Sequence, residues 1–158
     1  EVFASWDGVD TLTLGERQDL DADDCLAQMV LHEVCHALIQ GEHAHREIDW
    51  GLGRAGESDG ARELAAIRLQ AAILTPLGLR SMLGVTTEWR ALYDALPNAP
   101  LEGEGEVFDL ARAGYKRATE GPWASALHRA LDATKRVAQA VHPFADESSL
   151  WATADPDT

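Results

Sequence analysis

Apolar residues recur at intervals of three and four through most of the chain, and this spacing predicts a mainly helical protein. One helix is predicted over about residues 23–40, with the Asp-rich stretch 21–24 before it as cap and Gly41 as its C-cap. A second helix is predicted from residue 59 or 60 to residue 75, where Pro76 interrupts the pattern. Because that helix is apolar on nearly every side, we expect it to be buried.

The first 20 residues follow a different pattern, since positions 11–15 alternate with the period of a β-strand. Asp7-Gly8 is a turn signal before this stretch, so a β-hairpin or a pair of short strands is predicted. Residues 42–58 are polar and irregular, and a loop of this length inside a domain is usually functional. Further helices are predicted over about 86–96, over 106–118 and after Gly121-Pro122. The fold class is therefore α+β, mainly α, with one domain over residues 1–142 and an acidic, mobile tail over 143–158.

The acidic composition limits the partners that we expect. The chain has 27 Asp and Glu against 13 Lys and Arg, a formal net charge of −14, and such a surface repels the phosphates of nucleic acids. No apolar run approaches the roughly 18 residues of a membrane span. We therefore expect no nucleic acid and no membrane as partner, whereas a basic peptide would be attracted. Because the sequence begins with Glu1 rather than Met, we also expect the natural chain to extend upstream.

Two cysteines bear on the cellular compartment. If Cys25 and Cys35 share the first predicted helix, ten residues separate them by about 15 Å, whereas a disulfide needs about 4.4–6.8 Å between Cα atoms. We therefore expect two free thiols, which favours a reducing compartment and a cytoplasmic location. Cys35 points away from the face of the two flanking histidines and is expected in the core.

The first predicted helix contains the motif His32-Glu33-x-x-His36. Residues i and i+4 lie on one face of a helix, so His32 and His36 can direct both imidazoles at one Zn²⁺. Glu33 lies about 100° further round the helix, within reach of a water on that metal. The neighbouring residues are uncharged, as expected for a helix that is buried behind a metal site.

A catalytic zinc usually has three protein ligands and one water, so a third ligand is expected downstream. Glu63 is the preferred candidate, because it is a lone carboxylate in the first turn of the second, buried helix. The alternative for Glu63 is an exposed residue that complements the helix dipole. The other candidate ligands lie in or next to the polar loop: His43, His45, Glu57 and Asp59.

In addition, the sequence of the second predicted helix resembles a motif of a known family. An HExxH motif followed by a Glu on another helix is the arrangement of the gluzincins. Glu63-Leu64-Ala65-Ala66-Ile67 through Ile73-Leu74-Thr75-Pro76 resembles the E-x-x-A-N … L-L-M-P helix of the ImmA/IrrE-like metallopeptidases. The resemblance covers residues 32–76 and departs at Ile67, where the family has Asn, and at Gln40, where many members have His. It implies a minimal zincin-like domain in which the hairpin or strands pack on the active-site helix, with a helical C-terminal part.

The hypothesis from the sequence is a zinc-dependent metallopeptidase that hydrolyses a peptide or protein substrate. In it, His32, His36 and Glu63 hold Zn²⁺ and Glu33 is the general base. Asp49 or Asp59 would orient the imidazoles, and Trp50 lines a cleft or packs in the core. The group that stabilises the oxyanion stays open among Tyr93, Tyr115, His43, His45, His128 and His142. One alternative is a zinc-stabilised binding or regulatory module without turnover, and another is a metal-free acidic interaction protein.

Overall fold

The structure is a computed structural model that describes residues 4–16, 18, 24–52 and 60–154. Its strands are β1 (Ala4–Trp6) and β2 (Leu12–Leu14). Its α-helices are α1 (Leu26–Gln40), α2 (Gly60–Leu74), α3 (Thr87–Asp94), α4 (Glu106–Glu120) and α5 (Ala124–Val141). Short 3₁₀ helices are η2 (Ala44–Arg46), η3 (Ile48–Gly51), η4 (Thr75–Leu77), η5 (His142–Phe144) and η6 (Leu150–Thr153). The predicted class, α+β and mainly α, is confirmed at this level.

The predicted hairpin is present. Strands β1 and β2 pair antiparallel, with Ala4 opposite Leu14 and Trp6 opposite Leu12. Its turn is organised by Asp7, whose carboxylate oxygen Oδ1 accepts hydrogen bonds from three successive backbone N–H groups at distances of 2.8 to 3.1 Å. Gly8 follows with φ of 80°, a conformation that favours glycine. The Asp-Gly pair therefore turns the chain for the physical reasons that the sequence indicated.

Helix α1 begins at Leu26, later than the predicted start at residue 23, which lies outside the described residues. The cap is Cys25, and its backbone N–H donates to Oε1 of Gln28 over 3.0 Å. At the other end Gly41 is the C-cap, as predicted, with φ of 101° and its N–H bonded to the Ala37 carbonyl.

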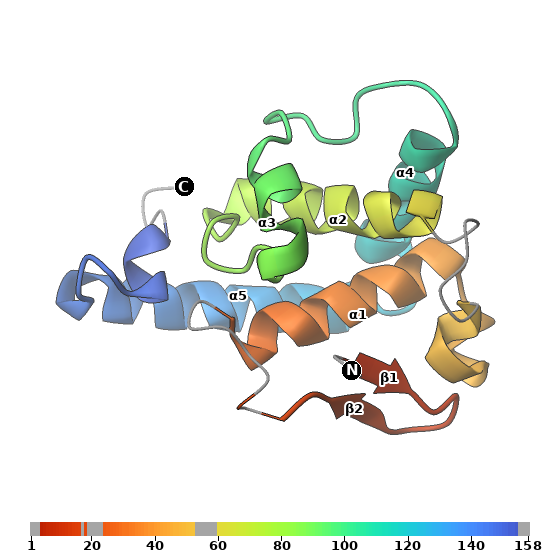
Figure 1. Cartoon of the computed structure of the whole chain (residues 1–158), viewed down its shortest axis with the longest axis horizontal. Coiled ribbons are helices and arrows are strands. Elements are labelled where there is room, and N and C mark those ends of the chain that lie inside the picture. The colour runs from red at the N-terminus through yellow and green to blue at the C-terminus, as the bar shows by residue number, and fades with distance from the viewer. Residues whose placement is uncertain (1–3, 17, 19–23, 53–59, 155–158) are drawn as a thin grey trace.

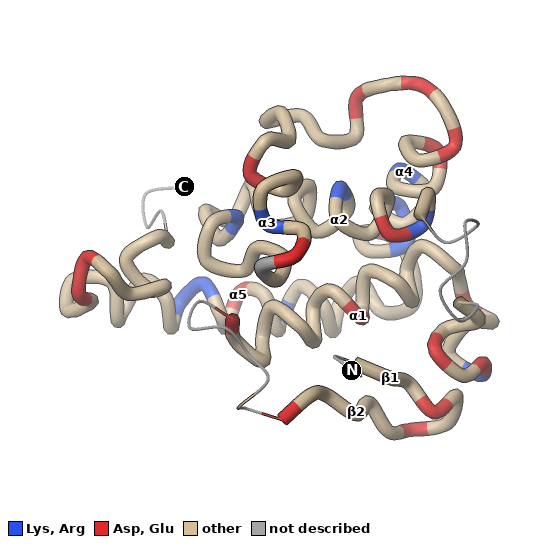
Figure 2. The backbone as a smooth tube through the Cα atoms, in the orientation of Figure 1, with Lys and Arg blue, Asp and Glu red and all other residues tan. Residues whose placement is uncertain are grey.

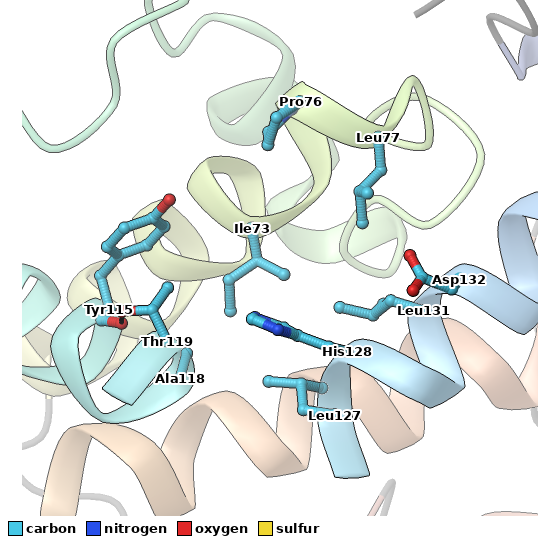
Figure 3. A pocket seen from close by; sticks show the side chains of 10 residues that line it. All are labelled: Ile73, Pro76, Leu77, Tyr115, Ala118, Thr119, Leu127, His128, Leu131 and Asp132. Carbon is cyan, nitrogen blue, oxygen red and sulfur yellow. Dashed lines mark hydrogen bonds between the residues drawn. The ribbon is translucent and has the colours of Figure 1, made fainter. Parts of the chain in front are cut away.

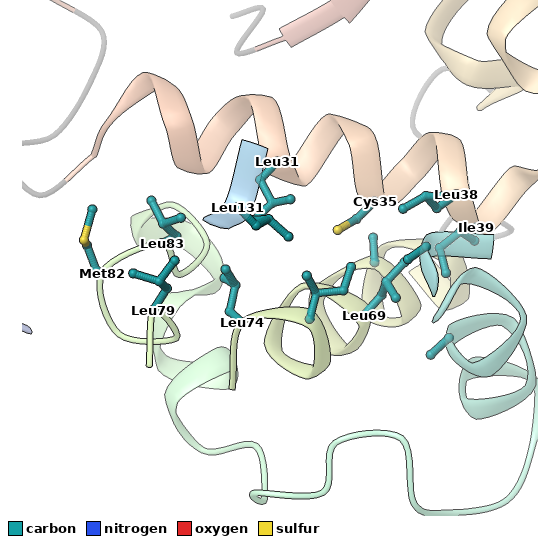
Figure 4. Close-up of a cluster of buried hydrophobic side chains, with 14 of the residues drawn as sticks. Leu31, Cys35, Leu38, Ile39, Leu69, Leu74, Leu79, Met82, Leu83 and Leu131 are labelled. Atoms are coloured by element: carbon teal, nitrogen blue, oxygen red, sulfur yellow. The ribbon is translucent and has the colours of Figure 1, made fainter. Parts of the chain in front are cut away.

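Helix α1 lies in the middle of the molecule. In Figure 1, α2 lies along one side of α1 and the hairpin lies on the other. The main core fills the space between α1, α2, α4 and α5, and Figure 4 shows leucines of α1 facing those of α2 across it. Gly114 on α4 allows a close approach, because a Cβ there would come within 2.9 Å of Leu69 and Ile39 side chains. The predicted burial of α2 is therefore confirmed, and Cys35 is buried between the two helices.

The C-terminal segment differs from the mobile tail that was expected. Its described part forms η5 and η6, and Leu150 and Trp151 pack against the main core. Two adjacent apolar residues thus anchor a segment whose acidic composition suggested a solvated tail. Within the described residues, no helix is both long enough and apolar enough to cross a membrane.

Candidate metal centre

Helices α1 and α2 bring three potential metal ligands together. Nε2 of His32 lies 3.1 Å from Oε1 of Glu63, and Nε2 of His36 lies 3.3 Å from Oε2 of the same carboxylate. The two Nε2 atoms are 3.0 Å apart. Within the described residues, this is the group of His, Cys, Asp and Glu side chains that could hold a metal ion. The i, i+4 spacing on α1 and the first turn of α2 therefore converge on one point.

Gln70 on α2 orients the imidazole of His32. Nε2 of Gln70 donates to the carbonyl of Leu83 over 2.8 Å, so its Oε1 is the atom that faces His32. That oxygen lies 3.0 Å from Nδ1 of His32, which must therefore carry the proton of the bond. In the neutral ring, Nε2 is then unprotonated and points its lone pair at the cluster. Gln70, which is 0% exposed, thus keeps His32 in the tautomer that a metal ligand needs.

The cluster combines a carboxylate with two imidazoles and therefore favours a cation. Burial by itself would raise the pKa of Glu63, but hydrogen bonds and charge from His32 and His36 hold that pKa well below its usual range. For His32, burial lowers the pKa, yet Glu63 and the bond to Gln70 outweigh it and the pKa is raised. In the absence of a metal, this raised pKa favours a proton on the His32 ring. Nδ1 of His36 is buried without a hydrogen-bond partner among the described residues, so this ring lacks the support that His32 has.

The side chain of Glu33 is held by Trp50. The indole Nε1–H donates to Oε2 of Glu33 over 2.9 Å, and the Trp50 side chain is buried. Trp50 stands in the polar loop, where the structure forms η2 and η3 in place of an irregular chain. Of the two possibilities raised for Trp50, packing in the core is confirmed, since it lies in a small cluster with Ala37 and Ala44. Its indole also contacts the predicted base.

The backbone that presents Trp50 is strained. Asp49 has φ of 49° and Trp50 has φ of 58°, so two consecutive non-glycine residues adopt the left-handed conformation. Asp tolerates this conformation, but for a bulky Trp it is rare, and such residues cost on the order of 1–3 kcal/mol each. Contacts with the hairpin stabilise the turn. The Asp49 carboxylate accepts from the Ser5 hydroxyl over 2.7 Å and from the Trp6 N–H over 3.1 Å.

The structure separates the remaining candidates from the cluster. His43 and His45 are not in it, and the ring of His45 lies against that of Trp123 with centroids 5.8 Å apart. The expectation that Asp49 orients the imidazoles is wrong, because its carboxylate bonds to the hairpin. Glu57 and Asp59 lie outside the described residues. Gln70, which does orient His32, was missed; its only signal was a polar residue on an apolar helix, seven positions after Glu63.

Four of the candidates for oxyanion stabilisation have partners or positions that are not part of the metal cluster. The Tyr93 hydroxyl donates to the Arg80 carbonyl over 3.0 Å, and Nδ1 of His142 lies 3.3 Å from the Trp151 carbonyl. Tyr115 and His128 line a cavity of about 230 Å³ between α2, α4 and α5 (Figure 3). Neither the cluster nor Glu33 lines that cavity. The structure thus assigns none of these four residues to the cluster.

Negative charge predominates in the molecule as a whole. Figure 2 shows acidic positions along much of the chain, including the loop between α3 and α4. With 27 acidic against 13 basic residues, the molecule as a whole attracts cations and basic peptides. This long-range field favours both a divalent metal and a positively charged ligand.

The donor set fits a transition metal such as zinc. Two imidazole nitrogens and one carboxylate form one of the ligand sets of catalytic zinc sites, which keep the fourth position open. Bonds of about 2.0–2.2 Å in a tetrahedral site place ligand atoms about 3.3–3.6 Å apart, slightly more than the 3.0 to 3.3 Å observed here. Comparisons with protein-family models, curated proteins and solved structures found no match. The chemistry of the site must therefore be inferred from its own geometry.

Proposed function

We propose that the protein is a zinc-dependent metallopeptidase in which His32, His36 and Glu63 hold the metal and Glu33 is the general base. The supporting observation is the convergence of two Nε2 atoms and one carboxylate within 3.0 to 3.3 Å. A structural zinc site would have four protein ligands and no need of a base. Here there are three candidate ligands, and the carboxylate of Glu33, which follows His32 on α1, is not one of them.

In this proposal each residue has a separate task. A bound Zn²⁺ supplies a Lewis acid that polarises the scissile carbonyl and makes water a stronger nucleophile. Glu33 accepts a proton from the attacking water as the new C–O bond forms, and it passes that proton to the amine nitrogen as the C–N bond breaks. Gln70 holds His32 in the tautomer whose Nε2 faces the metal.

The acidic surface suggests the class of substrate. Negative charge repels nucleic acids and favours peptides with Lys or Arg, and it raises their local concentration at low ionic strength. We therefore propose a peptide or protein substrate with basic residues near the cleaved bond. A zinc-binding module without turnover is the alternative, and it predicts the same metal content with no cleavage.

The test combines metal analysis with a mixed peptide library. The wild type should retain one zinc per chain after dialysis and cleave peptides in the library, lose the activity on chelation and regain it with Zn²⁺. Glu33→Gln should keep the zinc and lose hydrolysis by about 10²–10⁴-fold, because the base is removed at unchanged size. Glu42→Gln is the matched control, since Glu42 is exposed and two residues beyond α1, and it should cleave like the wild type. Equal cleavage by Glu33→Gln and the wild type would refute the role of the base, and zinc without cleavage would favour the binding module.

A further inference from the structure

A positioned carboxylate is needed for the chemistry proposed above, and Glu33 on its own would not be well positioned. A glutamate has three rotatable side-chain bonds and populates several rotamers when it is half-buried on a helix. Small displacements of a catalytic group cost much of the rate, since proximity effects depend on the reacting atoms being aligned. The structure holds one of its two oxygens through the Trp50 indole, over 2.9 Å.

We infer that Trp50 is a positioning residue that orients the Glu33 carboxylate for proton transfer, and that the N-terminal hairpin holds Trp50 in place. This inference rests on the proposed function. The indole occupies Oε2 and leaves the other oxygen of the carboxylate to take the proton. The indole N–H is a donor only, so it cannot itself remove that proton or compete for it.

The hairpin supports Trp50 by four contacts that are independent of Glu33, one to its ring and three to the neighbouring residues of the loop. The Trp6 ring stacks on that of Trp50, with centroids 4.6 Å apart and an interplanar angle of 3°. The indole N–H of Trp6 donates to the His45 carbonyl over 2.9 Å, which ties the stacked ring to the loop. The Asp49 carboxylate bonds to Ser5 and to the backbone of Trp6.

The left-handed turn explains why such support is needed. With Asp49 and Trp50 both at positive φ, the isolated loop would favour other conformations, in which the indole leaves Glu33. Strain of this kind persists where surrounding contacts determine it, and it occurs preferentially at functional sites. The hairpin therefore has a task beyond covering α1, which is to keep the indole directed at the base.

Turnover of the best-cleaved library peptide tests the positioning role. Trp50→Phe removes the N–H and keeps an aromatic ring for stacking, so kcat should fall about tenfold, with KM within twofold and one zinc per chain. Trp89→Phe, the same change beside the small core around Tyr93, is the matched control and should match the wild type. An unchanged or higher kcat in Trp50→Phe would overturn the inference, and a higher one would mean that the indole restrains Glu33.

Indole NMR tests the contact without relying on activity. The ¹H–¹⁵N spectrum should contain five Trp indole signals, and Trp50→Phe identifies its own by the signal that disappears. In Glu33→Ala the Trp50 proton should move to lower frequency, because a charge-assisted hydrogen bond is lost. Asp49→Ala should move it in the same direction by releasing the turn. If the Trp50 signal has the same frequency in Glu33→Ala as in the wild type, the contact is overturned whatever the turnover. If the signal shifts but the protein cleaves nothing, only the proposed function is overturned.

Discussion

Replacing Gln70 tests the support of the metal site separately from its ligands. In Gln70→Leu the side chain keeps about the same volume but loses both of its hydrogen bonds. Nδ1–H of His32 then has no acceptor, and the Leu83 carbonyl has no donor, in a position that is 0% exposed. His32 keeps its contacts at Nε2, but the hydrogen bond at Nδ1 that selects its tautomer and holds the angle of its ring is lost.

The expected magnitude follows from these two losses. Removing the outer partner of a metal-ligating histidine typically costs 10–100-fold in metal affinity, which corresponds to about 1.4–2.7 kcal/mol. Each buried group left unpaired costs about 1–3 kcal/mol of folding free energy, part of which the apolar leucine recovers. We therefore expect the free energy of unfolding of zinc-free Gln70→Leu to fall by about 2–4 kcal/mol, below the stability of a typical domain.

Zinc affinity should be measured by competition with a chromophoric chelator, and stability by urea unfolding in the absence of zinc. Gln28→Leu is the matched control, because Gln28 is also a buried glutamine, 1% exposed, with two side-chain hydrogen bonds. Its partners are Cys25 and Asp24 at the start of α1, away from the cluster. Gln28→Leu should therefore lose stability and keep its zinc affinity. The role given to Gln70 would be refuted if Gln70→Leu bound zinc as tightly as the wild type. It would also be refuted if Gln28→Leu lost as much zinc affinity as Gln70→Leu.

Three further predictions concern the ligands, the thiols and the end of α1. Glu63→Ala should lose most of its zinc on dialysis while His45→Ala retains it, as measured by elemental analysis; full retention in Glu63→Ala would exclude this ligand set. Thiol titration without reductant should give two thiols per chain in denaturant, and in the native protein Cys25 should react before Cys35, whose thiol pKa is raised by burial. Arg117→Ala should lower the urea-unfolding free energy by about 1.5–3 kcal/mol, because the guanidinium bonds to two carbonyls at the end of α1, over 2.6 and 3.0 Å. The same change at an exposed arginine of α5 should have little effect, and equal losses would contradict the capping role.

The predictable part of the fold depended on local rules. The caps and turns followed from Asp7-Gly8 and Gly41, since each residue has the conformation or the hydrogen bonds that its position requires. The burial of α2 followed from its apolar composition. The packing of the C-terminal segment was not foreseen, because acidic composition describes the average of a stretch, whereas Leu150, Trp151 and Ala154 attach its described part to the core.

In the candidate site, too, some features followed from the sequence and others only from the tertiary structure. By itself, the sequence determined that His32 and His36 share a helical face, because the geometry of an α-helix sets the positions of residues i and i+4. It also indicated Glu63, as a carboxylate at the start of a helix too apolar to be exposed. Only the tertiary structure decided that α2 lies at the angle and height that bring this carboxylate within 3.3 Å of both imidazoles. The contacts of Gln70 and Trp50 with His32 and Glu33 were also decided there. They join residues that are 38 and 17 positions apart, and no periodicity along the chain specifies which distant side chains will meet when helices and loops pack.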